Sequence, residues 1–430
     1  MMKSNRTSRF ASGTATALLL GVSSVQAQTE PRTLLVWDQF TDEGANRAAD
    51  MVYAAFEEAH PEIDIVREVY SYDQIRAIAR TALASDTGPD VIYHEVGIGN
   101  AGVLADAGLI RSLEPYAEEY GWKDRVQPAA IEEGNLGGEL YGLGLEFEFF
   151  GTYYNSDLMT ELGLSVPQTL EETKAFCAAA REAGVIPFVL NLNPGWQAYH
   201  LISAVIYDVL GAEAANALLF EDGGRWDSPE VADALRIAFV ELRDAECYPE
   251  DITALLYDDA AALFYSGEAV AWPTGTWALG RVADNMPDVD VELRPFPSVA
   301  GDDTQYVPTG VGSAYYIAEN AERPDDAALF LDFLFGEEAA AIWAEEAGFI
   351  PPVPLDMDAL SVPPLFESAL DTIQTSGREP GDPVRVGTFI NHFVPASFVS
   401  SLRDGPQGVV TGVSSPEELA ADFQTQWETR

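Results

Sequence analysis

The stretch that decides the fold reads Glu139-Leu-Tyr-Gly-Leu-Gly-Leu-Glu146-Phe-Glu148-Phe-Phe-Gly-Thr-Tyr-Tyr-Asn-Ser-Asp-Leu158. Its middle is aromatic and aliphatic, with glycines where the backbone must bend, which is typical of a buried strand. Glu146 and Glu148 stand two residues apart, and on a strand that spacing puts both side chains on one face. Buried carboxylates need partners, so this face should meet protein donors or a polar ligand. We interpret the stretch as the place where the chain passes from one lobe to another, beside a ligand.

Upstream of this stretch, apolar runs and amphipathic segments alternate. The pattern predicts strands over 33–37, 63–66 and 90–93, separated by helices over 44–59 and 73–85. This rhythm is typical of a parallel sheet with helices on its faces. Ligands of such sheets collect at the carboxyl ends of the strands. One crevice should therefore gather the side chains of Trp37, Asp38, Gln39, His94 and Glu95.

Downstream, the same kinds of pattern continue to the end of the chain. Helices are predicted over 169–183, 197–210, 228–244 and 252–264, and strands over 185–190, 269–272, 289–294 and 312–317. Three helical patterns follow the proline-rich break at 351–354. The whole chain is thus predicted to be α/β, with enough residues for two lobes that each have a core.

The net charge is extreme, with 23 basic and 70 acidic residues giving -47. Such a surface repels nucleic acid and anionic lipid. The acids are spread along the whole chain, which favours adaptation to salty surroundings, where salt screens the repulsion. The rival explanation for the many acidic residues is that the protein binds a cationic ligand.

The N-terminus has a basic start, a short apolar run and small residues ending at Ala27. This pattern predicts a secretory signal over residues 1–27, cleaved near Ala27, and therefore a soluble protein exported to the periplasm. The alternative is an uncleaved anchor. We expect no later stretch to be long enough to span a membrane. In an oxidising compartment Cys177 and Cys247 can form a disulfide, or they can stay as two buried thiols, and the sequence leaves both options open.

Several enzyme signatures fail on their context. Gly97-Ile-Gly99-Asn-Ala-Gly102 matches a dinucleotide-binding fingerprint, but the second strand and acidic residue that should follow are missing, so a tight turn is the better interpretation. The four histidines lack metal-site spacing, and we expect neither a metal nor another cofactor. A glycosidase needs carboxylates on both sides of the scissile bond, whereas Glu146 and Glu148 share one strand.

Tryptophans in loops are better evidence of function than these enzyme signatures. An aromatic face stacks on the C–H face of a sugar, while acids and amides take its hydroxyl groups. Trp196 and Trp277 lie beside Pro and Gly in loops that follow strands, whereas Trp272 lies within a strand and is expected in the core.

With these segments in order, the chain resembles the family 1 extracellular solute-binding proteins of bacterial ABC importers, the class that includes maltose-binding protein. The resemblance runs from about residue 33 to the carboxyl end and is carried by an ordered series of short pieces. They are the strand ending at Trp37, Phe56-Glu-Glu-Ala-His-Pro61, Gly88-Pro-Asp90-Val-Ile, Ala107-Gly-Leu-Ile-Arg-Ser-Leu113, Leu140-Tyr-Gly-Leu143, Tyr154-Asn-Ser-Asp-Leu158, Ser266-Gly-Glu-Ala-Val-Ala-Trp-Pro-Thr-Gly-Thr-Trp277, Pro324-Asp-Asp-Ala-Ala-Leu-Phe-Leu-Asp-Phe-Leu334 and Gly348-Phe-Ile-Pro351.

The resemblance implies a two-lobe periplasmic-binding-protein fold of type II, in which each lobe is a sheet flanked by helices and hinge crossovers join the lobes. Lobe 1 would comprise 31–146 and 306–343, and lobe 2 would comprise 147–305 and 344–430. The implied ligand contacts are Asp38, Gln39, His94 or Glu95, Glu148 with Glu146, Asn193, Trp196, Trp277, Gly310, Gly312 and Tyr315. Relatives often have proline after the Tyr-Gly piece, where this chain has its two acids.

The function expected from all of this is capture of a small carbohydrate, a mono- to trisaccharide or a glycosylated polyol, by a monomer that docks on an ABC permease. Nothing would be chemically transformed. One alternative is a cationic ligand such as a polyamine, whose affinity should fall as ionic strength rises. The others are an exported glycosidase and a structural protein of the cell envelope.

Overall fold

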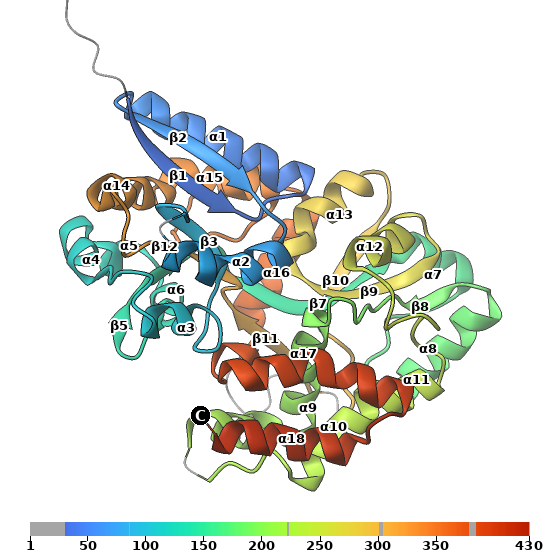
Figure 1. Ribbon diagram of the computed structural model, residues 1–430. Coiled ribbons are helices and arrows are strands. Elements are labelled where there is room, and N and C mark those ends of the chain that lie inside the picture. The colour runs from blue at the N-terminus through green and yellow to red at the C-terminus, as the bar shows by residue number, and fades with distance from the viewer. Residues whose placement is uncertain (1–30, 86, 222, 301–303, 378–383, 430) are drawn as a thin grey trace, which may run out of the picture.

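The computed structural model describes residues 31–85, 87–221, 223–300, 304–377 and 384–429. The predicted signal peptide, residues 1–27, lies outside the described residues. The described chain forms two α/β lobes, each with its own sheet and its own hydrophobic core (Figure 1). This is the two-lobe arrangement that the sequence predicts.

Lobe 1 is built on a five-stranded sheet in the order β2-β1-β3-β12-β6. β1 pairs in parallel with β2 and β3, as the βαβ pattern predicts, and β12 is antiparallel to β3 and β6. The strands are β1 Arg32–Asp38, β2 Ile63–Val69, β3 Val91–Glu95, β6 Gly142–Gly144 and β12 Ser313–Ile317, and a small hairpin is formed by β4 Asn135–Leu136 and β5 Glu139–Leu140.

The helices of lobe 1 cover this sheet. They are α1 Glu43–Ala59, α2 Tyr72–Ala84, α3 Ala101–Asp106, α4 Glu114–Tyr120, α5 Trp122–Arg125, α6 Pro128–Glu133, α14 Pro324–Leu334 and α15 Glu337–Ile342. Ser71 caps α2 in a capping box with Gln74, which starts the helix directly after β2. The first residue of α2, Tyr72, is thereby fixed at the carboxyl end of the sheet, where the site lies.

Lobe 2 is built on a six-stranded sheet in the order β13-β11-β7-β9-β8, with β10 also paired to β7. β7 is antiparallel to β9, β10 and β11, and it lies between the two lobes in Figure 1. The strands are β7 Glu148–Asn155, β8 Ile186–Phe188, β9 Ala269–Gly275, β10 Val291–Arg294, β11 Gln305–Gly310 and β13 Val384–Thr388.

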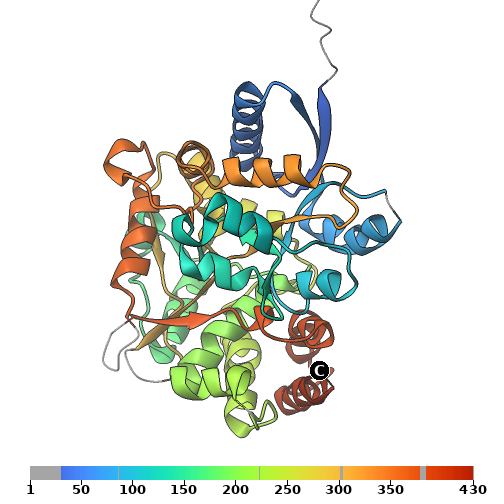
Figure 2. The same ribbon diagram turned by 90° about the vertical axis from the view of Figure 1, so that its left-hand side faces the viewer.

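The helices of lobe 2 come from distant parts of the chain. They are α7 Ser156–Leu162, α8 Leu170–Glu182, α9 Trp196–Phe220, α10 Pro229–Arg236, α11 Leu242–Asp244, α12 Tyr257–Tyr265, α13 Leu279–Asn285, α16 Pro364–Thr375, α17 Ala396–Thr411 and α18 Pro416–Glu428. The C-terminal helices α17 and α18 pack against α9 and α10, respectively. Figure 2 shows these helices in a view turned by 90°. Cys177 of α8 forms a disulfide with Cys247, which settles the option that the sequence leaves open.

Two lobe boundaries differ from the sequence prediction. The sequence prediction places residues 306–310 in the return to lobe 1, but they belong to β11, which pairs with β7 and β13 of lobe 2. The chain returns to lobe 1 only at 311–312, between β11 and β12. The last crossing also falls later than residue 344, because Phe349 and Val353 still pack in the core of lobe 1. Apolar side chains run through both junctions, so hydrophobicity alone does not mark them.

One helix of the described residues, α9, is long and apolar enough to cross a membrane, contrary to the expectation that no such stretch exists. It consists of two helical segments that meet at Gly211, whose backbone is not helical. Residues 198–207 lie almost entirely in the core of lobe 2. Burial inside the lobe explains the apolar composition of α9.

Candidate functional site

A cavity of about 370 Å³ opens between the two lobes. Its walls combine residues from both sheets and from the crossings between them. Lobe 1 contributes Gln39, Tyr72 and Glu95, lobe 2 contributes Trp196, Tyr257 and Trp277, and the crossings contribute Glu146, Glu148 and Gly312. The volume lies at the small end of the range of about 300–1,000 Å³ that is usual for ligand pockets.

One wall is aromatic. Trp196 is the first residue of α9, Tyr257 the first of α12, and Trp277 follows β9. The Trp196 ring lies 4.8 Å from the Tyr257 ring and 5.9 Å from the Trp277 ring, measured between centroids. The Trp277 Nε1 donates a hydrogen bond of 3.1 Å to the Tyr257 hydroxyl, which fixes the orientation of both rings. The cluster presents flat, half-buried apolar faces to the cavity.

The cavity also has a polar side. Two carboxyl groups at the first crossing, those of Glu146 and Glu148, contribute to it. Both are buried and within hydrogen-bonding reach of each other. Burial raises the pKa of Glu148 to about 8, with the nearby His392 opposing the rise. Burial and the neighbouring Glu148 charge raise the pKa of Glu146 well above its usual value. The pair therefore holds protons near neutral pH and can both donate and accept hydrogen bonds.

Gly312 at the second crossing leaves room for this pair. A Cβ at residue 312 would lie 2.2 Å from the Glu148 Oε2, so only glycine allows the carboxyl group to sit against the crossing.

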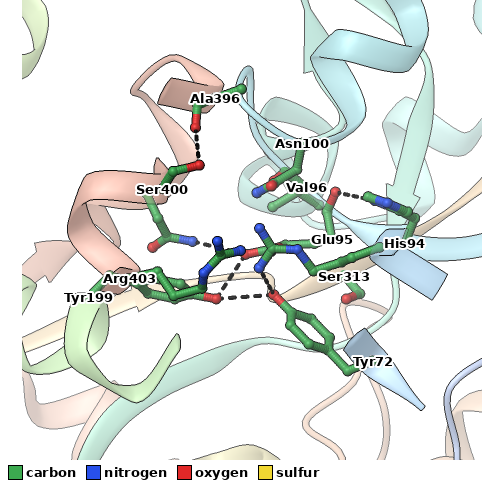
Figure 3. A network of polar contacts seen from close by, with 12 residues as sticks. Tyr72, His94, Glu95, Val96, Asn100, Tyr199, Ser313, Ala396, Ser400 and Arg403 are labelled. Atoms are coloured by element: carbon green, nitrogen blue, oxygen red, sulfur yellow. Dashed lines mark hydrogen bonds and ion pairs between the residues drawn. The ribbon is translucent and has the colours of Figure 1, made fainter. Parts of the chain in front are cut away.

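A polar network joins the lobes on another side of the cavity (Figure 3). The Tyr199 hydroxyl of lobe 2 donates to the Glu95 Oε1 of lobe 1 at 3.0 Å, and it also lies 3.0 Å from the Tyr72 hydroxyl. Asn391 Nδ2 donates to the same Glu95 oxygen at 3.3 Å, and Arg76 lies 3.5 Å from the other oxygen. We call these five residues the interlobe network, because they link the lobes directly through side chains.

Two histidines in the cavity wall differ in charge. Burial lowers the pKa of His392, but the carboxylates of Glu133, Glu95 and Glu148 outweigh this effect and raise its pKa above the usual value. Its Nδ1 lies 2.8 Å from the Glu133 Oε2. Burial, together with the charge of His392, lowers the pKa of His200 well below its usual value. His392 is therefore the cationic member of the two, and His200 is neutral.

The structure brings seven of the predicted contact residues together at this cavity: Gln39, Glu95, Glu146, Glu148, Trp196, Trp277 and Gly312. They come from β-sheet edges and crossings, as the rule of ligands at strand ends implies.

Three predicted contacts at the end of β1 and in β12 turn into the core of lobe 1 instead. Asp38 is fully buried and is held by Arg67, whose Nε donates to it at 2.7 Å, and by the hydroxyl of Tyr53 at 3.0 Å. Tyr315 pairs with the same Tyr53 hydroxyl at 3.0 Å. Trp37 packs on the Tyr70 ring rather than on the cavity. The prediction that these three residues contact the ligand is not supported by their positions, because internal partners hold Asp38 and Tyr315 and the Trp37 ring packs within lobe 1.

Three further predicted contacts also lie outside the cavity wall. His94 turns its Nδ1 toward the backbone oxygen of Glu95 at 3.1 Å, away from the cavity. Asn193 donates to the backbone oxygen of Ala254 at 3.3 Å. Gly310 pairs with Glu148 as the last residue of β11 and faces Phe389 and His392. Adjacent residues on a strand face opposite sides, so Glu95 reaches the cavity and His94 cannot.

Sequence reasoning missed several residues of the cavity wall: Tyr72, Tyr199, His200, Tyr257, Arg281, Asn391 and His392. For some of these residues the sequence does contain a feature that points to the cavity. Tyr72 follows the capping serine at the end of β2, and Tyr199 and His200 stand three and four residues after Trp196 on the same face of α9. Asn391 and His392 carry no such signal, because they reach the cavity only through the late return of the chain.

The comparisons with known proteins agree with this architecture. Residues 41–341 match the family model of the bacterial extracellular solute-binding proteins. A binding protein of Brucella abortus is 23% identical over 304 residues, covering 70% of this chain and 71% of the relative. The multiple sugar-binding protein of Streptococcus mutans is 24% identical over 271 residues, covering 60% of this chain and 63% of the relative.

Among solved structures, that of a chitin oligosaccharide binding protein superposes with a TM-score of 0.79 at 21% identity, covering 92% of this chain and 98% of that one. At this identity the likeness establishes the shared fold. The protein belongs to the family of bacterial extracellular solute-binding proteins, since the family model matches more than half of the chain.

Proposed function

We propose that the protein captures a small carbohydrate, a mono- to trisaccharide or a glycosylated polyol, and delivers it to the membrane permease of an ABC importer. The observation that carries the proposal is the cavity between the lobes, in which the aromatic wall of Trp196, Tyr257 and Trp277 faces hydrogen-bonding groups. The names of the Streptococcus relative and of the oligosaccharide-binding structure support it.

The two kinds of wall suit the two kinds of surface on a sugar ring. The axial C–H groups of the ring pack on indole and phenol faces, which are apolar. The equatorial hydroxyl groups need donors and acceptors, and Glu146, Glu148 and Glu95 lie at the same cavity. Part of the binding energy offsets the cost of bringing the lobes together.

The proposal is binding without turnover. Hydrolysis of a glycoside needs two carboxyl groups on opposite sides of the bond, about 5–9.5 Å apart. Glu146 and Glu148 come from one short segment and hydrogen-bond to each other, so they cannot flank a glycosidic bond. Incubation with a panel of glycosides should release no product.

The proposed place of action is the periplasm, reached through the signal predicted over residues 1–27, and the proposed working form is a monomer. The permease would recognise the closed pair of lobes. Sedimentation of the purified protein at one subunit mass, with and without sugar, is the expected result.

The first experiment is a thermal-shift screen of mono-, di- and trisaccharides and sugar polyols, followed by calorimetric titration of each hit. A ligand that binds the folded state raises the melting temperature, by a free energy of about 2.7 kcal/mol at a concentration 100 times Kd. At least one carbohydrate should bind with one-to-one stoichiometry. A screen in which only carbohydrate-free compounds bind would overturn the proposal.

A further inference from the structure

Among the described residues, the Glu146–Glu148 pair has no Lys or Arg beside it, whereas other charged groups near the cavity have a partner of opposite charge. Arg281 pairs with Asp258 at 2.9 Å, Arg76 lies 3.5 Å from Glu95, and His392 pairs with Glu133 at 2.8 Å. Within the described part of the chain, no Lys or Arg lies within ion-pair distance of Glu146 or Glu148. Two buried carboxyl groups without a cation must either keep protons or receive a positive charge from outside the protein.

Unpartnered atoms around the same cavity point to a donor-rich ligand. Three buried side-chain atoms in its wall have neither a hydrogen-bond partner nor an ion-pair partner among the described residues: Glu146 Oε2, Asn391 Oδ1 and His200 Nδ1. The two oxygens are acceptors. Buried acceptors without donors are costly, so the ligand is expected to bring N–H or O–H groups to them.

An ammonium group fits this demand better than a hydroxyl group. It presents three donors and no acceptor, and it carries the charge that the acid pair lacks. The neighbouring rings of Trp196, Trp277 and Tyr257 also attract a cation to their faces.

We propose that Glu146 and Glu148 form a subsite for the protonated amine of a basic carbohydrate, such as an amino sugar, whose ring lies on the aromatic wall. This inference rests on the proposed carbohydrate function and narrows it to a ligand class. In the free protein the two carboxyl groups hold protons, and the incoming ammonium displaces one of them. The displaced proton passes to the solvent.

The charged and titratable groups that face the pair set the direction of this exchange. Asp42 at the start of α1 and Glu95 of β3 add negative charge, as does Glu133 of α6, and His392 adds the opposing positive charge. Tyr93 of β3 feels both glutamates and stays protonated, because burial raises the pKa of its hydroxyl. The surroundings are therefore negative overall, which favours a cation beside the pair.

The test is calorimetric titration with matched probes. The pairs are glucosamine against N-acetylglucosamine, 6-amino-6-deoxyglucose against glucose, and the chitosan disaccharide against its N-acetylated form. Putrescine serves as an amine without a ring. The best amine should bind about 10- to 150-fold more tightly than its uncharged counterpart, the range expected for a hydrogen bond to a charged group. Its enthalpy should change with the ionisation enthalpy of the buffer, because binding releases a proton.

Variants separate the acid pair from general charge effects. Glu146→Gln and Glu148→Gln should remove the preference for the amine and the proton release. Glu171→Gln is the control, because it makes the same change in net charge at an exposed position of α8. It should leave the preference unchanged.

The outcomes distinguish this inference from the proposed function. If uncharged sugars bind as tightly as their amines, the amine subsite is wrong and carbohydrate capture stands. If putrescine binds more tightly than every amino sugar, the subsite stands and the carbohydrate proposal fails. If none of the probes binds, the amine subsite is contradicted, and the wider sugar screen decides the carbohydrate proposal.

Discussion

The substitution Tyr199→Phe isolates the interlobe network with the loss of one oxygen atom. The Tyr199 hydroxyl belongs to α9 of lobe 2, and both of its partners, Glu95 and Tyr72, belong to lobe 1. Its removal leaves the Asn391 hydrogen bond of 3.3 Å as the remaining contact to Glu95 from lobe 2 in this network. The ring itself stays, so packing around it is preserved.

The expected magnitude follows from the charge on Glu95. A hydrogen bond to a charged group contributes about 1.5–3 kcal/mol, so the ratio of closed to open molecules should fall by roughly 10- to 150-fold. The apparent Kd is the intrinsic Kd divided by the fraction of competent molecules. The Kd for any bound sugar should therefore rise, by no more than the same factor.

Small-angle X-ray scattering of the ligand-free protein measures the change directly, and titration of the same samples gives Kd. The Tyr199→Phe variant should have a larger radius of gyration than wild type without ligand, and saturating sugar should restore the wild-type value. Tyr316→Phe is the matched control, because its buried hydroxyl has no hydrogen-bond partner among the described residues. If Tyr199→Phe scatters and binds like wild type, the network does not hold the lobes together.

Four further predictions concern the aromatic wall, the disulfide, the surface charge and the acid pair. Trp277→Leu should weaken sugar binding by about 1–2 kcal/mol, or roughly 5- to 30-fold in titrations, and unchanged affinity would show that the ring does not touch the ligand. Replacing Cys177 and Cys247 with serine should lower the unfolding free energy by about 2–4 kcal/mol in urea, because the bridge closes a loop with a sequence separation of 70 residues, and equal stability would contradict this. Raising NaCl from 0.1 to 1 M should stabilise the protein, because the Debye length falls from about 10 to 3 Å and the repulsion among acids is screened; a flat or falling midpoint of unfolding would refute the role of charge. Between pH 4.5 and about 8 the unfolded chain loses the Glu148 proton while the folded protein keeps it, so stability falls as pH rises through this window; Glu148→Gln should flatten that slope, and an identical slope would exclude Glu148 as its source.

The sequence predicted the elements whose signals are local. The βαβ pattern of residues 33–93 is present as β1 to β3. Trp196 and Trp277 reach the cavity because Trp196 begins α9 after a loop and Trp277 lies in the short helical turn directly after β9. Glu95 was expected at the crevice together with His94, and strand alternation allows only one of the two to face it.

Contacts set by distant residues were not predictable in this way. Asp38 has the composition and position of a ligand contact, yet Arg67 from β2 satisfies it inside lobe 1. The return at 311–312 lies between two mainly apolar strands, β11 and β12, so pairing rather than hydrophobicity decides to which sheet β11 belongs. Asn391 and His392 enter the site because the chain after β13 folds back onto α9.

The most direct test of carbohydrate capture is a crystal structure of the protein with its tightest-binding carbohydrate. We predict an intact sugar between the lobes, with a ring face on Trp196 or Trp277 and a polar group on Glu146 or Glu148. A ligand bound elsewhere, or a cleaved product in the cavity, would contradict it.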